Sequence, residues 1–404
     1  MLRSSGLALF VLIACTPVDD APSAPRVVDA GRPQQTDGPV PWNPDLGGQP
    51  VPPPATDAPD APPADEAPVV GDGPALPDAE PPKPLGEPTL RTVPLPVRRV
   101  VILSIDGLRA DALEGQLYDL PGFTALRRDG ASTLDARTDP GRTVTLPNHT
   151  CMITGRPTDG PEGHGFIYNG VTDQTLHEIK GSYVASIFDV AHDQGLGTAL
   201  VASKPKFDLY PHSYDAAHGA PDRIPPDHGR GKLDVVHIQS YDDDATLAYA
   251  LEILEADQVR LLFIHLYECD SAGHGFGFDP TLGTPYAAAV IRQDARIQRL
   301  RAALGPNTVL LVTTDHGGTG LGHSDPTLEV DYTIPFLAVG AGVRSGADLY
   351  VLNAGKRENP GTRRAHDAAI QPIRNCEVGN LALGLLGLPP VPGSMYGRDP
   401  LRLR

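Results

Sequence analysis

The chain of 404 residues is poor in cysteine, in aromatic residues and in basic residues. Four cysteines are too few for a disulfide-rich scaffold. The chain has 33 Lys and Arg residues and 50 Asp and Glu residues. With a net charge of −17, it therefore lacks the excess of basic residues that binding to nucleic-acid phosphates requires. The apolar stretch at 7–14 is too short to span a bilayer. These absences exclude a nucleic-acid-binding protein and a small disulfide-stabilised one.

The first 15 residues have the layout of an export signal, with Arg3 before the apolar stretch and Cys15 after it. The sequence Leu-Ile-Ala-Cys at 12–15 resembles a bacterial lipobox, in which cleavage precedes a cysteine that is then lipidated. We therefore expect residues 1–15 to be a lipoprotein signal peptide and Cys15 to carry the lipid. The expected location is the bacterial cell envelope, at the outer membrane, because Thr16 is not the Asp that retains lipoproteins at the inner membrane. The alternative is an ordinary signal peptide with an incidental cysteine.

Residues 16–97 consist mainly of Pro, Ala, Asp and Gly, with Trp42 as the one tryptophan of the chain. Such a segment cannot bury enough apolar surface to offset the entropy of ordering it, and proline and acidic residues extend it. We predict a disordered tether here. The remaining residues, 98–404, suit one large α/β domain.

Three short apolar runs, at 100–105, 261–266 and 309–314, are typical of buried parallel strands. The aspartates that follow these runs are Asp106, Asp270 and Asp315. Further strands are expected at 198–202 and 333–339, and helices at 110–128 (interrupted at Pro121), 146–153, 186–194, 244–255 and 285–304. Strands that alternate with helices predict an α/β fold with a mostly parallel central sheet and helices on both faces.

Residues 204–239 interrupt this alternation. They are rich in Pro, Gly, His and Asp and exceed an ordinary connection in length. We interpret them as an inserted cap or rim over the site.

Apart from Cys15, the cysteines are Cys151, Cys269 and Cys376. An odd number of cysteines without close spacing argues against a disulfide framework, although one disulfide is possible in an oxidising compartment. We expect buried thiols.

Histidines accompany the aspartates at the predicted strand ends. Asp270 precedes His274 by four residues, Asp315 is adjacent to His316, and His323 follows shortly after. Ligands bind at the carboxyl ends of strands in open α/β sheets, so these side chains should gather at one edge. Carboxylate oxygen with imidazole nitrogen suits Zn²⁺. We predict a site for divalent metal, with room for more than one ion.

A nucleophile is expected just before the helix predicted at 146–153. The amino end of a helix favours an anion, and a neighbouring metal would lower the pKa of the Thr145 hydroxyl. Thr145 could equally be a plain helix cap, and the two roles are compatible. Thr143 is the competing nucleophile, although it lies further from the helix start.

Several motifs together resemble the alkaline phosphatase superfamily and are most similar to its type I phosphodiesterase and nucleotide pyrophosphatase branch. They are DGLRAD from residue 106, TLPNHTCMITG from 145, HGFIYN from 164, D-SAGH from 270, DHGG-GLGH from 315 and IPFLAVGAGV from 334. The matching segments run from about residue 100 to the chain end, with 204–239 unmatched.

The resemblance implies two divalent metal ions, taken to be Zn²⁺. The ligands that it implies for one ion are Asp270, His274 and His323; for the other they are Asp106, Asp315, His316 and the oxygen of Thr145. Asn169 matches the asparagine that hydrogen-bonds a nonbridging phosphate oxygen. His366 is the substitute for His323, because that ligand lies further along the chain in animal members.

Two lysines, Lys204 and Lys206, faintly resemble a substrate-gripping pair in phosphonoacetate hydrolases. They would contact an anionic group of the substrate; a solvated pair at a strand end is the alternative.

These expectations converge on a lipid-anchored, extracytoplasmic phosphodiesterase or nucleotide pyrophosphatase that acts through a phosphothreonine intermediate. Its expected partners are a small phosphate ester or pyrophosphate and, through the lipid, a membrane. The enzymatic alternatives are a phosphomonoesterase or a phosphonate hydrolase with the same site. An alternative of another class is a non-catalytic surface-binding module on a stalk.

Overall fold

The computed structural model describes residues 97–114, 117–222 and 229–404. The predicted signal peptide at 1–15 and the predicted tether, except for Val97, lie outside the described residues. Among the residues that are described, no helix combines the length and the apolar character that crossing a membrane requires.

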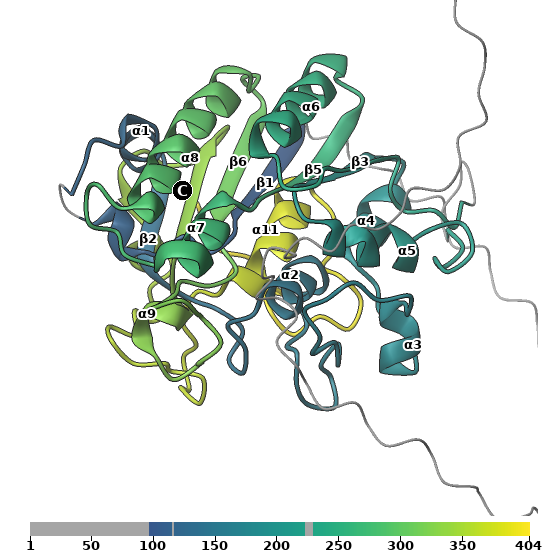
Figure 1. Ribbon diagram of the computed structural model, residues 1–404. Helices are drawn as coiled ribbons and strands as arrows, with labels where there is room; N and C mark the ends of the chain where they lie inside the picture. The colour runs from purple at the N-terminus through teal and green to yellow at the C-terminus, as the bar shows by residue number, and fades with distance from the viewer. Residues whose placement is uncertain (1–96, 115–116, 223–228) are drawn as a thin grey trace, which may run out of the picture. The chain divides into compact units, whose positions relative to one another are not determined.

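An eight-stranded sheet has the strand order β4-β3-β5-β1-β6-β7-β2-β8 (Figure 1). The strands from β4 to β6 pair in parallel, β7 is antiparallel to both β6 and β2, and β8 is parallel to β2. The strands are β1 (Arg99–Ile105), β2 (Ala131–Arg137), β3 (Gly197–Ala202), β4 (Val235–Ile238), β5 (Val259–Leu266), β6 (Thr308–Thr313), β7 (Thr333–Gly340) and β8 (Ala347–Asp348). The predicted mostly parallel sheet is therefore confirmed.

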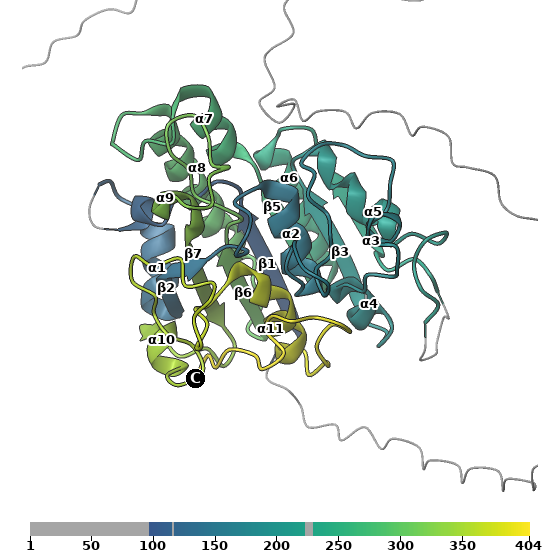
Figure 2. The ribbon, with the colours of Figure 1, turned by 90° about the horizontal axis from the view of Figure 1, so that it is seen from below.

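Helices cover both faces of this sheet, as predicted. Val101 and Leu103 of β1 pack in one apolar cluster with residues of α1, α6 and α8. Val100 and Ile102 pack in a second cluster with residues of α2, α4 and α11. Figures 1 and 2 show α8 and α11 on opposite sides of the strands. Side chains of alternate residues in the central strands thus pack into two separate hydrophobic layers, one on each face of the sheet.

The helices differ widely in length. The α-helices are α1 (Pro121–Asp129), α2 (Thr145–Thr154), α3 (Leu176–Lys180), α4 (Ile187–His192), α5 (Leu209–Ser213), α6 (Asp243–Ala256), α7 (Glu268–Phe276), α8 (Pro285–Ala302), α9 (Glu329–Tyr332), α10 (Leu349–Leu352) and α11 (Val378–Leu385). The 3₁₀ helices are η2 (Asp111–Leu113), η3 (Pro205–Asp208) and η4 (Asn375–Glu377). The predicted interruption near Pro121 is real: η2 ends before it, and α1 begins at this proline.

Residues 204–239 contain more regular structure than the sequence indicated. They include η3, α5 and β4, and β4 extends the sheet at one edge beside β3. Residues 223–228 of this segment lie outside the described part. Its role as a cap over the site stays a prediction.

Candidate metal centre

The three central strands bring three aspartates to one edge of the sheet. β1 lies between β5 and β6, and Ile105 pairs with Leu266 at the carboxyl ends. The chain then turns so that the Asp270 backbone N–H donates to the Asp106 carbonyl at 3.0 Å. Asp315 Oδ1 accepts from the Gly107 N–H at 3.1 Å. Asp106, Asp270 and Asp315 are all buried, which is costly for carboxylates without cations.

One group of possible ligands comprises Asp270, His274 and His323. Asp270 and His274 stand four residues apart on α7, so they share one helix face. Asp270 Oδ1 lies 3.3 Å from His274 Nε2 and 3.7 Å from His323 Nε2, and the two nitrogens are 3.1 Å apart. Ligands at about 2.0–2.1 Å from a tetrahedral Zn²⁺ are about 3.3 Å apart, so these separations suit one ion.

A second group comprises Asp106, Asp315 and His316, all buried. His316 Nε2 lies 3.4 Å from Asp106 Oδ1 and 3.2 Å from Asp315 Oδ2. The two groups adjoin, because His316 Nε2 is 4.0 Å from Asp270 Oδ1 and the His316 and His323 rings stack with centroids 3.5 Å apart. The six residues predicted from the sequence thus form two neighbouring triads.

Hydrogen bonds fix the tautomer of each histidine in these triads. The Nδ1–H of His274 donates to the Leu321 carbonyl at 2.8 Å, that of His316 to the Gly317 carbonyl at 2.8 Å, and that of His323 to the Thr143 carbonyl at 2.6 Å. A carbonyl only accepts, so the proton is on Nδ1 and the lone pair is on Nε2. Each Nε2 is therefore ready to bind a metal.

Several buried polar atoms of the site have no hydrogen-bond partner within the described part of the chain. They include Asp106 Oδ1, Thr145 Oγ1, Asp270 Oδ1, Asp315 Oδ2 and His316 Nε2. Buried acceptors are normally paired, and a shared cation satisfies them when no donor does. The residues present therefore fit the divalent ions that the sequence predicted.

The pKa values of the carboxyl groups separate strongly. Burial acts to raise the pKa of Asp106, but the Lys204 ammonium and His265 hold it well below its usual range. Burial and the charges of Asp106 and Asp270 raise the pKa of Asp315 well above its usual range. Burial and the neighbouring His316 lower the pKa of His323 to about 3, which keeps its imidazole neutral at pH 7. A divalent cation at this position would favour ionised Asp315.

Thr145 is the first residue of α2, and its buried side chain lies at the amino end of that helix. The first turn of α2 adjoins the second triad: His149 Nδ1 is 3.7 Å from Asp315 Oδ2 and donates to the Thr145 carbonyl at 2.8 Å. The Asn375 side chain donates to Asn148 and to the Thr314 carbonyl, both at 3.1 Å. These contacts fix the amino end of α2 to the end of β6.

Thr143, the competing nucleophile, is also buried, and its hydroxyl has no hydrogen-bond partner among the described residues. Its carbonyl holds His323 in place. Its position before the helix leaves it outside the first turn of α2. Both threonines therefore adjoin the triads.

Asn169 and the two lysines also lie at this edge of the sheet. Asn169 Oδ1 accepts from the Leu146 backbone N–H and from Lys206 Nζ, both at 3.1 Å. Lys204 Nζ lies 2.6 Å from Asp270 Oδ2 and 2.9 Å from Asp106 Oδ2. Lys206 is thus joined to the start of α2, whereas Lys204 is joined to the triads. His366 instead lines a separate depression of about 450 Å³ with Asp139 and Arg364.

Sequence reasoning gave no role to two buried histidines at this site. His265 on β5 places Nε2 2.9 Å from Asp106 Oδ2, and His149 on α2 contacts Ser104 Oγ at 2.8 Å. His265 could have been noticed in the sequence only because a titratable residue is unusual inside an apolar strand. Burial lowers the pKa of both imidazoles, so both act as neutral hydrogen-bonding groups.

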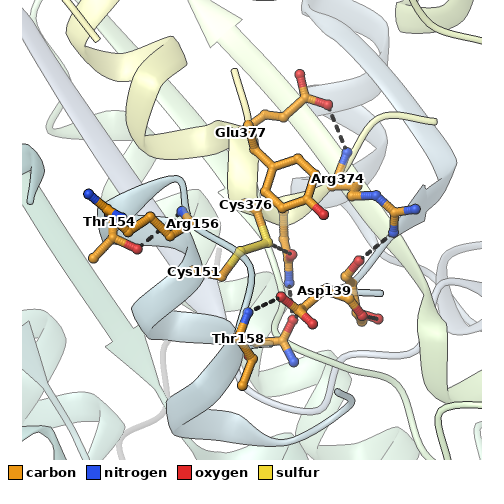
Figure 3. The surroundings of a disulfide bond; sticks show 12 residues. Asp139, Cys151, Thr154, Arg156, Thr158, Arg374, Cys376 and Glu377 are labelled. Carbon is orange, nitrogen blue, oxygen red and sulfur yellow. Dashed lines mark hydrogen bonds between the residues drawn. A yellow bond between two sulfur atoms is a disulfide. The ribbon is translucent and has the colours of Figure 1, made fainter. Parts of the chain in front are cut away.

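A disulfide joins Cys151 on α2 to Cys376 on η4, across 225 residues of sequence (Figure 3). The expectation of buried thiols was therefore wrong for these two and holds for Cys269, which is buried and free. Spacing could not reveal the pair because α2 and η4 meet only in the folded chain. The bridge anchors the helix that begins with Thr145 to the carboxyl-terminal part of the protein.

Parts of this chain are similar in sequence to known phosphopentomutases. Phosphopentomutase of Clostridium acetobutylicum is 33% identical over 131 residues, which cover 31% of this chain and 30% of the relative. Phosphopentomutase of a Methylobacterium species is 48% identical over 65 residues, 15% of each chain. The chain thus spans less than a third of the length of these curated relatives.

The fold resembles that of murine ectonucleotide pyrophosphatase/phosphodiesterase 5, solved as an inactive variant with AMP. The TM-score is 0.51 at 16% sequence identity, covering 76% of this chain and 100% of the murine one. The profile of the type I phosphodiesterase / nucleotide pyrophosphatase family matches residues 100–369. This match spans well over half of the sequence and both triads, and the protein therefore belongs to the type I phosphodiesterase / nucleotide pyrophosphatase family.

Proposed function

We propose that this protein is a metal-dependent hydrolase that cleaves phosphodiester or pyrophosphate bonds of small molecules outside the cytoplasm. The two triads hold one divalent ion each, taken to be Zn²⁺ from the mixture of carboxylate and imidazole ligands. The observation that carries the proposal is the group of unpartnered buried atoms, Thr145 Oγ1 among them, at the edge of the sheet where the two triads lie.

Thr145 is the proposed nucleophile. When bound, the two ions would supply Lewis-acid stabilisation of the attacking and leaving oxygens. The Thr145 hydroxyl gives its proton to solvent as its oxygen attacks phosphorus, and the leaving alcohol, which takes a proton from solvent, or the leaving phosphate departs from the opposite side. The positive amino end of the α2 dipole, where Thr145 lies, favours the developing negative charge. Water then attacks the phosphothreonine, and Thr145 Oγ leaves to restore the hydroxyl.

Asn169 and Lys206 are the proposed substrate contacts. The Asn169 side-chain oxygen accepts from Lys206 Nζ and from the Leu146 N–H, and these two bonds hold the amide group beside the start of α2, where the resemblance places a contact with a nonbridging phosphate oxygen. The Lys206 side chain is buried beside the start of α2, so its positive charge favours an anionic substrate there.

The preference for diesters over monoesters tests the proposed reaction. We expect the zinc-loaded protein to hydrolyse bis(p-nitrophenyl) phosphate with a higher kcat/KM than p-nitrophenyl phosphate. A strong preference for the monoester would instead indicate a phosphomonoesterase built on the same site. Absence of turnover with both, in protein that retains its metal, would favour a binding module.

A matched pair of variants tests the nucleophile. Thr145→Ala should lower kcat by about a thousandfold or more while leaving the metal content unchanged, because it removes the attacking oxygen. Thr143→Ala removes a hydroxyl of the same kind two residues away and should retain most of the activity. The reverse pattern would assign the attack to Thr143.

Export and lipid attachment at Cys15 complete the proposal. The Cys151–Cys376 disulfide supports it, because such bridges persist in oxidising compartments. We expect the expressed protein to fractionate with membranes and to take up labelled fatty acid, and both properties should be lost in Cys15→Ser. Fatty-acid labelling of the Cys15→Ser protein would refute the assignment.

A further inference from the structure

Lys204 has an unusual position for a lysine near the end of a strand. It follows β3 by two residues, and its side chain is only 3% exposed. Its Nζ lies 2.6 Å from Asp270 Oδ2 and 2.9 Å from Asp106 Oδ2. Asp270 and Asp106 belong to different triads, so one ammonium group joins the two halves of the candidate metal centre.

The oxygens that Lys204 contacts are not those that face the triads. Asp270 Oδ1 is the atom near His274 and His323, and Asp106 Oδ1 is the atom near His316. Both Oδ1 atoms have no hydrogen-bond partner among the residues described, whereas both Oδ2 atoms are held by Lys204. His265 Nε2 adds a second contact to Asp106 Oδ2, at 2.9 Å. Each carboxylate is thus divided into a held oxygen and an available one.

This division has a consequence for metal selectivity. Zn²⁺ in tetrahedral sites takes few ligands at short distance, whereas Ca²⁺ takes six to eight oxygens and often both oxygens of a carboxylate. A carboxylate whose second oxygen is held by an ammonium group can give only one oxygen to a metal. Partners of this kind also fix the direction of the ligand.

We propose that Lys204 is a positioning residue of the metal centre, which ties the two triads together and holds Asp106 and Asp270 as single-oxygen ligands. This inference rests on the proposed two-metal function. It assigns to Lys204 a structural effect on the ligands, and it leaves contact with the substrate to Lys206. Lys204 thereby favours small tetrahedral ions over Ca²⁺.

Charge alone predicts a different result from positioning. Removing an ammonium group lowers the repulsion felt by every divalent ion, so Zn²⁺ and Ca²⁺ would both bind more tightly by similar factors. Releasing the held oxygens instead permits two-oxygen binding, which helps Ca²⁺ and loosens the geometry for Zn²⁺. The ratio of the two affinities therefore separates the effects.

The experiment uses metal-free full-length protein and the variants Lys204→Met and Lys204→Gln, with Lys206→Met as the matched lysine control. Zn²⁺ and Ca²⁺ affinities are measured by competition with a coloured chelator, and folding is checked by circular dichroism. We expect the preference for Zn²⁺ over Ca²⁺ to fall by about 10- to 100-fold in both Lys204 variants. The preference should stay unchanged in Lys206→Met.

Cobalt substitution gives an independent signature, because tetrahedral Co²⁺ absorbs visible light more strongly than five- or six-coordinate Co²⁺. The Lys204 variants should lose intensity relative to the wild type. An unchanged Zn²⁺/Ca²⁺ preference with a wild-type cobalt spectrum would overturn the inference, and a raised KM in the same variants would then assign Lys204 to the substrate. A wild-type protein that takes up less than one divalent ion per chain would overturn the proposed two-metal function itself.

Discussion

At the scale of single residues, hydrogen bonds within the protein determine which atom of each side chain is left to bind a metal. His274, His316 and His323 each use Nδ1–H on a backbone carbonyl, and this leaves Nε2 for a metal. Asp106 and Asp270 each use one carboxylate oxygen on Lys204. Because these bonds form within the protein, the ligand atoms are oriented before any ion binds, which reduces the entropy that binding must overcome.

His164, outside the triads, gives a pH-dependent prediction. Burial lowers the pKa of His164 from 6.5 to about 3. At pH 5 its imidazole is therefore neutral in the folded protein but protonated in the unfolded chain. The stability that wild type has over His164→Gln should therefore fall by about 2 kcal/mol from pH 7 to pH 5. Urea unfolding of both proteins at the two pH values measures this, since other titrating groups cancel in the difference. A pH-independent difference would show that His164 titrates normally.

The sequence predicted which six side chains would gather, because the aspartates follow strands and the histidines belong to motifs of a recognisable family. It did not predict the contacts of Lys204 or His265 with Asp106. Those contacts depend on β5 lying next to β1 and on β3 lying on the far side of β5, and this strand order cannot be deduced from local periodicity.

At the scale of helices and strands, α7 is one of the elements that the sequence pattern did not reveal. Its residues include two glycines and a serine, which are weak helix formers. The helix forms where Asp270 packs against Gly107, whose φ is +69° and whose added Cβ would lie 2.9 Å from Asp270 Cα. A close backbone approach thus places Asp270 and His274 opposite the end of β1.

Gly107→Ala should therefore disturb the site through α7. We expect a loss of about 1–3 kcal/mol in the free energy of unfolding from the left-handed backbone and the contact together, and a weaker Zn²⁺ affinity. Gly181→Ala is the matched control, because Gly181 has a φ of +73° and nothing within 4 Å of its added Cβ. It should lose stability from the backbone alone and keep its Zn²⁺ affinity. Equal Zn²⁺ affinities in both variants would refute this account of α7.

The disulfide between α2 and η4 gives a second prediction at this scale. Replacing Cys151 and Cys376 with alanine should lower the free energy of unfolding by about 2–5 kcal/mol, because the bridge closes a long loop in the unfolded chain. Chemical denaturation with and without a reducing agent measures the effect. Reductant should destabilise the wild type and leave the double variant unchanged; an equal response of both proteins would show that the bridge does not form in solution.

At the scale of the whole molecule, composition and alternation were sufficient to predict an α/β fold with a mostly parallel sheet. They did not predict β2 or β8, because β2 mixes buried with half-exposed positions and β8 has only two residues. Nor did they predict that part of 204–239 would extend the sheet as β4. Short edge elements owe their structure to a neighbouring strand more than to their own sequence.

In the proposed reaction, the two triads hold two metal ions and turnover needs both. Titration of metal-free protein with Zn²⁺, while hydrolysis of bis(p-nitrophenyl) phosphate is followed, shows how many ions turnover requires. We expect no activity without metal and a rise in activity that reaches its plateau at two equivalents of Zn²⁺ per chain. A plateau at one equivalent, or full activity in the metal-free protein, would show that turnover does not need both ions.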